Sequence, residues 1–131
     1  MTSLDTNILV RYLLNDDPQQ GKIALTLLSS SDEFTAPISV LLELVWVLEV
    51  NDCTREEILK GVRHILGLPN FKMKELEAIT YAIRWYEGGM DFGDALHLSL
   101  SARDERFVTF DRSMEKMARK MATFPPVYLE K

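Results

Sequence analysis

The sequence predicts an α/β protein, a three-layer α/β/α sandwich with a central, mainly parallel sheet. Short apolar segments rich in β-branched and aromatic residues alternate with longer segments whose apolar residues recur at helical spacing. No repeat, low-complexity segment or Pro/Gly/Ser-rich linker interrupts the 131 residues, so we expect a single domain over residues 1–131. Ligands of such sheets bind beyond the carboxyl ends of the strands. Residues that follow strands are therefore the first candidates for a site.

The first half of the chain shows this alternation clearly. Asp17 and Ser39 are residue types that favour N-caps, and Pro18 suits the first helical position. The expected elements are, in order, a strand ending at Leu4, a helix over about Asn7–Leu14, a helix beginning at Pro18, a short strand closing at Pro37 and a helix over about Ser39–Val50.

The second half continues the same pattern. Thr54 and Glu57 have the spacing of a capping box, and Gly67 and Gly88 are placed to end helices. The expected elements are, in order, a helix ending near Gly67, a weak strand in 69–74, a helix over Lys74–Glu87, a helix over about Asp91–Arg103, a strand over 106–110, a helix from Arg112 to about Ala122 and a closing strand in 126–130.

Composition narrows the classes of function. Twenty acidic and fifteen basic residues give a net charge of -5, which argues against binding nucleic acid through overall positive charge. A polyanionic substrate would need a local device, such as a divalent cation in an acidic cleft. No signal peptide or membrane span is recognisable, so we expect a cytoplasmic protein with no membrane partner. The lone Cys53 excludes a disulfide within one chain and a structural zinc site.

Four acids, Asp5, Glu43, Asp94 and Asp111, follow strands or lie in the first turns of the helices after them. Helix capping is a good explanation for Asp111 taken alone, because a carboxylate at an N-cap accepts backbone donors and meets the helix dipole favourably. It also explains Asp91 and Asp94, three residues apart, as an N-cap and an N3 residue. Asp5 is ambiguous in the same way.

Glu43 is harder to explain as a structural residue. Its helical neighbours at three and four positions are largely apolar, so its face of the helix is expected to pack inward. An unpaired buried carboxylate costs several kcal/mol and requires neutralisation, an ion pair such as one with Arg84, or a cation. Considered together, the four acids favour a site, because converging carboxylates require a counter-charge that Mg²⁺ or Mn²⁺ supplies.

Four segments of the chain carry a resemblance to a known family. "LDTNILVRYLL", "SVLLELVWVL", "DFGDALHLSLSA" and "RFVTFDR" are similar, in order and spacing, to the signature blocks of PIN-domain ribonucleases, and especially to the VapC-type toxins of bacterial and archaeal toxin–antitoxin pairs. The resemblance covers nearly the whole chain. It implies a PIN-like fold and the Mg²⁺-dependent hydrolysis of RNA phosphodiester bonds by an activated water molecule, with Mn²⁺ as a possible alternative ion.

The resemblance also implies roles for individual residues. The catalytic and metal-binding acids would be Asp5, Glu43, Asp94 and Asp111. Asn7 and Thr109 match polar positions that support the cluster, and Asp91 competes with Asp94 for the third acid position. Asp5, Asp94 and Asp111 would hold the ion directly, and Glu43 would either bind it through water or help to take the proton.

Candidate contacts with RNA and protein complete the sequence-based hypothesis. Arg11, Arg112 and Lys116 are basic residues near the acids, although a solvated helix face is the more ordinary explanation for the last two. Core packing explains most of the apolar surface of the helices that carry Tyr12 and Trp46. The remainder suits docking of a cognate antitoxin protein or of a second copy in a homodimer. The alternatives are a catalytically silent PIN-like scaffold that binds protein, and a phosphatase-type domain with Asp5 as nucleophile, for which no accompanying motif is present.

Overall fold

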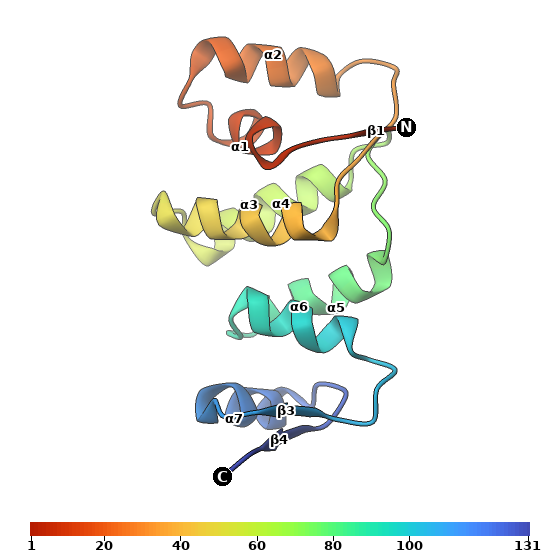
Figure 1. The fold of residues 1–131 in the computed structure, drawn as a ribbon. Helices are drawn as coiled ribbons and strands as arrows, with labels where there is room; N and C mark the ends of the chain where they lie inside the picture. The colour runs from red at the N-terminus through yellow and green to blue at the C-terminus, as the bar shows by residue number, and fades with distance from the viewer. The chain divides into compact units, whose positions relative to one another are not determined.

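A computed structural model describes all residues from 1 to 131 as seven helices and four short strands. The chain forms two compact units, which we call unit 1 (Met1–Lys74) and unit 2 (Glu75–Lys131). Each unit contains one pair of parallel strands together with helices (Figure 1). The predicted α/β class is therefore confirmed, and its parallel strands occur as two pairs. None of the seven helices is both long and apolar enough to cross a membrane.

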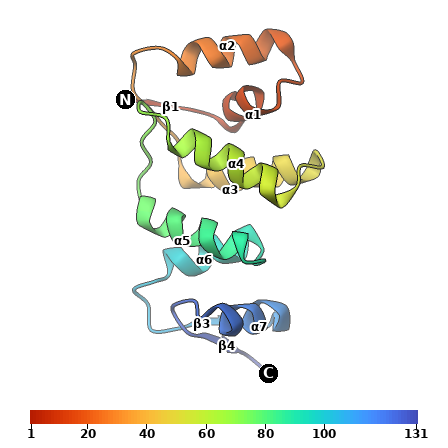
Figure 2. The same cartoon turned by 180° about the vertical axis from the view of Figure 1, so that it is seen from behind.

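Unit 1 contains a parallel strand pair and four helices. Its elements are β1 (Thr2–Ser3), α1 (Thr6–Leu14), α2 (Pro18–Leu28), β2 (Phe34–Thr35), α3 (Ile38–Val50) and α4 (Arg55–Leu66). Strand β1 pairs with β2, and the predicted weak strand in 69–74 is reduced to one parallel bridge between Phe71 and Phe34. Helix α1 contacts α2 and α3, and α4 lies alongside α3 (Figure 2).

The helix ends of unit 1 test the sequence-based capping predictions. The Asp17 carboxylate accepts a hydrogen bond from the Gln20 amide, and Thr54 and Glu57 form the complete capping box. Both caps are confirmed. The prediction that Ser39 caps α3 is wrong, because the helix begins at Ile38 with Pro37 as N-cap. The Pro37 carbonyl accepts a hydrogen bond from the Val40 amide, so the first helical turn closes before a cap at Ser39 could form.

Unit 2 contains two helices in tandem followed by a β–α–β segment. Its elements are α5 (Leu76–Glu87), α6 (Phe92–Leu100), β3 (Phe107–Thr109), α7 (Arg112–Met121) and β4 (Val127–Leu129). Figure 1 shows α5 beside α6, and α7 beside the β3–β4 pair. The two strands are parallel and in register from Phe107 opposite Val127 to Thr109 opposite Leu129.

The turn between α5 and α6 sets the start of α6. Helix α5 ends at Gly88 as predicted, and Gly89 adopts a φ of 115°, a backbone conformation that residues with a Cβ rarely adopt. Helix α6 ends earlier than the predicted Arg103, at Leu100, where the Ser101 hydroxyl donates a hydrogen bond to the His97 carbonyl. This hydroxyl competes for a carbonyl of the last turn and helps to end the helix.

Candidate active site

Asp91 and Asp111 occupy equivalent positions in unit 2, each as the N-cap of a helix. The Asp91 Oδ2 atom accepts a hydrogen bond of 3.1 Å from the Asp94 amide at the start of α6. The Asp111 Oδ1 atom accepts one of 3.1 Å from the Met114 amide at the start of α7. Helix capping, the structural explanation for these two acids, is therefore confirmed. A cap uses one carboxylate oxygen, so it leaves the other available to a ligand.

Asp94 occupies the N3 position of α6, as predicted, three residues after the N-cap Asp91. Its half-buried side chain lies in the first turn of α6 and makes no cap. Burial raises the pKa of the Asp94 carboxyl, the negative charges of Asp91 and Asp111 raise it further, and His97 opposes them. Three carboxylates of unit 2 are therefore electrostatically coupled, and the charged form of Asp94 is the disfavoured one. A bound cation would reverse that preference.

The turn from β3 to α7 holds Asp111 in place. The Thr109 Oγ1 atom accepts a hydrogen bond of 3.0 Å from the Asp111 amide. The Thr109 carbonyl accepts one of 2.8 Å from the Glu130 amide, which ties the same residue to the end of β4. The predicted supporting residue Thr109 thus contacts the backbone of Asp111 and anchors it to the strand pair.

Asp5 lies in unit 1, at the N-cap position of α1. Its backbone is extended, with φ of -83° and ψ of 160°, yet its exposed side chain makes no capping hydrogen bond. Helix capping therefore does not explain Asp5. The next residue, Thr6, is buried with a hydroxyl that has no hydrogen-bond partner, and Asn7 is exposed. The orphaned hydroxyl was missed by sequence reasoning, because only its burial distinguishes Thr6 from any other threonine.

The prediction that the Glu43 carboxylate faces inward is wrong. The side chain is exposed, and Trp46, one turn further along α3, is 62% exposed. The residues of α3 that pack inward are Leu41, Leu44, Val45 and Leu48. Because α3 is apolar around most of its circumference, sequence periodicity did not identify its buried face. The suggested partner Arg84 lies in unit 2, where its guanidinium carbon is 5.3 Å from the centre of the Tyr81 ring.

The three basic side chains that are candidates for contacting RNA differ in their surroundings. Arg11 lies in the last turn of α1, where its guanidinium pairs with the Asp16 carboxylate at 2.8 Å and donates a hydrogen bond to Gln20. This guanidinium therefore fixes the α1–α2 connection. Arg112 and Lys116 are exposed on α7 and line a groove at the end of the β3–β4 pair.

The two other titratable residues considered, His64 and Cys53, show no sign of a catalytic role. His64 is hydrogen-bonded to the Tyr12 hydroxyl at 2.7 Å, and the two rings stack with their centres 5.6 Å apart. Burial, followed by the charges of Glu57 and Asp52, raises the pKa of the Cys53 thiol. A thiol with a raised pKa is mostly protonated at neutral pH and therefore a poor nucleophile.

The ligand atoms in unit 2 are of the type that a hard divalent cation prefers, but they are not gathered into a metal-binding group. Asp91, Asp94 and Asp111 carry carboxylate oxygens, the ligands that Mg²⁺ prefers. Burial is the main cause of the raised pKa of Asp94, and the negative charges of Asp91 and Asp111 add to it. The structure contains no group of three or more His, Cys, Asp or Glu residues close enough together to hold a metal ion. Asp5 and Glu43 belong to unit 1, whereas Asp94 and Asp111 belong to unit 2.

Comparison with known proteins assigns the family. The family model described as PIN domain matches residues 3–120, a segment that includes all four predicted acids and extends over both units. The chain therefore belongs to the PIN domain family. PIN domains are typically metal-dependent nucleases that act on RNA or other nucleic acids, so membership indicates nuclease function in general. No curated protein matches the chain significantly.

Proposed function

We propose that the protein is a Mg²⁺-dependent endoribonuclease and the toxin component of a type II toxin–antitoxin system of the VapC type. The coupling of Asp94 to Asp91 and Asp111 carries the proposal, because a half-buried carboxylate beside two like charges is suited to a cation. Membership of the PIN domain family supports nuclease chemistry on a nucleic acid. Residues 1–131 act as one domain in this proposal.

Each acid has a role in the proposed reaction. Asp5, Asp94 and Asp111 would hold Mg²⁺ or Mn²⁺, and Glu43 would assist in metal binding or proton transfer. The bound ion supplies positive charge that activates water and stabilises charge on the phosphate. Thr109 positions Asp111 through its backbone amide, and Asn7 and Asp91 are supporting polar residues.

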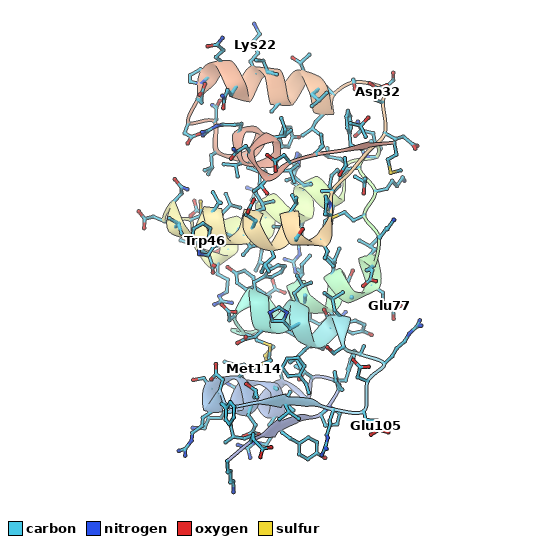
Figure 3. All side chains as sticks on the ribbon, in the orientation of Figure 1. Lys22, Asp32, Trp46, Glu77, Glu105 and Met114 are labelled. Carbon is cyan, nitrogen blue, oxygen red and sulfur yellow. The ribbon has the colours of Figure 1, made fainter.

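A protein partner is part of the proposal. An antitoxin or a second copy of the chain would cover apolar side chains that unit 1 leaves exposed, among them Trp46 on α3 (Figure 3). Partner binding would keep the nuclease inactive until the antitoxin is removed. Co-expression with a small protein encoded next to this chain, the place expected for an antitoxin, followed by size-exclusion chromatography, measures whether a complex forms and whether the free chain is a homodimer.

The test of the nuclease is cleavage of a mixed RNA pool with Mg²⁺, with Mn²⁺ or with a chelator. We expect metal-dependent cleavage that is lost in Asp94→Asn and in Asp5→Asn. The matched controls are Asp104→Asn in unit 2 and Asp32→Asn in unit 1, two exposed acids outside the proposed site. Cleavage that persists in both site variants would remove the proposal, as would cleavage that the chelator leaves unchanged.

The caps formed by Asp91 and Asp111 favour a second candidate, a catalytically silent PIN-like scaffold. Asp111→Asn separates the two functions, because asparagine caps a helix about as well as aspartate but carries no charge. The nuclease requires loss of cleavage in this variant with little change in stability. The scaffold predicts that neither the variant nor the unmodified chain cleaves RNA, and that both bind the protein partner equally well.

A further inference from the structure

A groove of about 710 Å³ lies in unit 2 between α7 and the end of the β3–β4 pair. We call it the basic groove. Arg112, Lys116 and Arg119 line it from α7, and Phe110, Leu129 and Glu130 line it from the strand side. Two of its lining residues, Phe110 and Arg112, are the chain neighbours of Asp111.

The groove has the opposite charge sign to the chain as a whole. Four basic side chains and two acidic ones line it, whereas the full sequence has a net charge of -5. One base is partly neutralised within the groove, since the Arg119 guanidinium lies 3.6 Å from the Glu115 carboxylate. Arg112 and Lys116 remain as exposed positive charges on α7. A local excess of positive charge attracts a phosphate backbone.

Phe110 is the most exposed large apolar side chain of the molecule, with 80% of its surface accessible. Leaving a phenylalanine in water forgoes the stabilisation that burial would provide, so its exposure points to a role other than packing. Proteins bind single-stranded nucleic acids by combining aromatic rings with basic side chains. The nucleobases stack on the rings, and the phosphates contact the basic side chains. Tyr128 on β4 differs, because the Arg106 guanidinium carbon lies 5.6 Å from its ring centre.

We propose that the basic groove binds single-stranded RNA, with a base stacked on Phe110 and phosphates bound by Arg112 and Lys116. The inference rests on the proposed nuclease function and adds to it a binding surface and a preference for unpaired RNA. A base in a duplex is already stacked on its neighbours and cannot lie flat on Phe110 without being displaced.

The test measures binding without cleavage. Fluorescence anisotropy with a labelled random-sequence RNA of about 12 nucleotides, a length that suits single-strand sites, is recorded on the full chain with a chelator present. We expect Phe110→Ala to weaken binding about tenfold or more, because one stacked base contributes about that much. Phe110→Trp should restore binding, since tryptophan keeps a ring face. Tyr128→Ala on β4 is the matched control, an exposed ring that does not line the groove, and should bind as the unmodified chain does.

Salt dependence tests the phosphate contacts separately. The logarithm of the binding constant falls with the logarithm of salt concentration, with a slope of about -0.7 for each phosphate neutralised on a single strand. Arg112→Ala and Lys116→Ala should each reduce the slope by about that amount. Lys22→Ala on α2 is the control, an exposed lysine of unit 1 (Figure 3). An unchanged slope in both groove variants would contradict the proposed contacts.

The outcomes separate this inference from the proposed function. If cleavage requires Asp94 but RNA binding is unchanged in Phe110→Ala, the proposed RNA-binding role of the basic groove is wrong and the proposed nuclease function is supported. Binding that depends on Phe110 in a chain that never cleaves RNA would support the groove and overturn the nuclease. Equal affinity for a duplex of the same sequence, no binding by the unmodified chain, or a Phe110-dependent dimer in size-exclusion chromatography would each refute the groove as a single-strand site.

Discussion

Individual carboxylates in this protein differ because their surroundings differ. Asp91 and Asp111 accept amide hydrogen bonds at helix starts, where the helix dipole favours negative charge. Asp94 lies in the same first turn as the Asp91 cap, but burial and its two acidic neighbours dominate, and its pKa is raised. The same residue type therefore stabilises the fold at two positions and carries an electrostatic penalty at the third.

From the raised pKa of Asp94 we predict how the free energy of unfolding depends on pH. Because the pKa of Asp94 is raised in the folded chain above its ordinary value of 3.8, folded protein holds that proton more tightly than unfolded protein does. The free energy of unfolding should therefore fall as pH rises from that value through the folded pKa. In a chelator at neutral pH, Asp94→Asn should be more stable than the unmodified chain, and the difference should vanish in acid, as measured by urea denaturation.

The control for this prediction is Asp104→Asn, which removes the same charge from an exposed turn. It should leave the stability nearly unchanged at both pH values. A lower stability of Asp94→Asn at neutral pH would contradict the electrostatic interpretation of the site. Added Mg²⁺ should reverse the order, since an ion that binds the folded unmodified chain stabilises it by mass action.

At the scale of single elements, capping controls where helices begin. Helix α4 has the complete reciprocal box, in which Thr54 Oγ1 accepts from the Glu57 amide and Glu57 accepts from the Thr54 amide. Thr54→Ala should cost about 1 kcal/mol of unfolding free energy. Thr26→Ala in α2 is the matched control, where alanine in an exposed helical position should be neutral or slightly stabilising. Thermal and urea unfolding of the two variants measure the difference.

An aromatic cluster supports the segment that connects α7 to β4. The Phe124 ring meets Tyr81 edge-on at 4.8 Å between centres and Trp85 edge-on at 5.2 Å. Phe124→Ala should lower the unfolding free energy by about 1 to 3 kcal/mol, because two aromatic pairs are lost. Phe110→Ala removes an equal side chain that is almost wholly exposed, so it should change stability little. Equal losses in both variants would contradict the assigned roles.

At the scale of the whole molecule, the proposal requires acids from both units to serve one reaction. Asp5 and Glu43 belong to unit 1, and Asp94 and Asp111 belong to unit 2. Bound Mn²⁺ is paramagnetic and broadens the NMR signals of nearby nuclei. If the chain acts as one domain, substoichiometric Mn²⁺ should broaden the amide signals of Asp5 and Asp94 together. Broadening confined to one unit would contradict the shared site, and Asp94→Asn should abolish the effect.

Sequence reasoning succeeded where the signal is local. The capping box at Thr54, the Asp17–Pro18 helix start and the helix end at Gly88 depend on residues within a few positions of one another, and all three are present. It failed at the start of α3, where Pro37 rather than Ser39 caps the helix, and at the orientation of Glu43. The first failure arises because Pro37 closes the first turn of α3, and the second because α3 is apolar around most of its circumference, so its pattern does not identify the buried face.

The sequence by itself determined the α/β class, the order of elements, the acidic residues that match the PIN pattern, and the capping that places Asp91 and Asp111 at helix starts. These follow from periodicity and short-range hydrogen bonding, which act along the chain. Only the tertiary structure decided that Asp94 is half-buried with a raised pKa, that Glu43 is exposed, and that Phe110 borders a basic groove. Burial and electrostatic coupling depend on which residues distant in sequence become neighbours, and no local pattern contains that information.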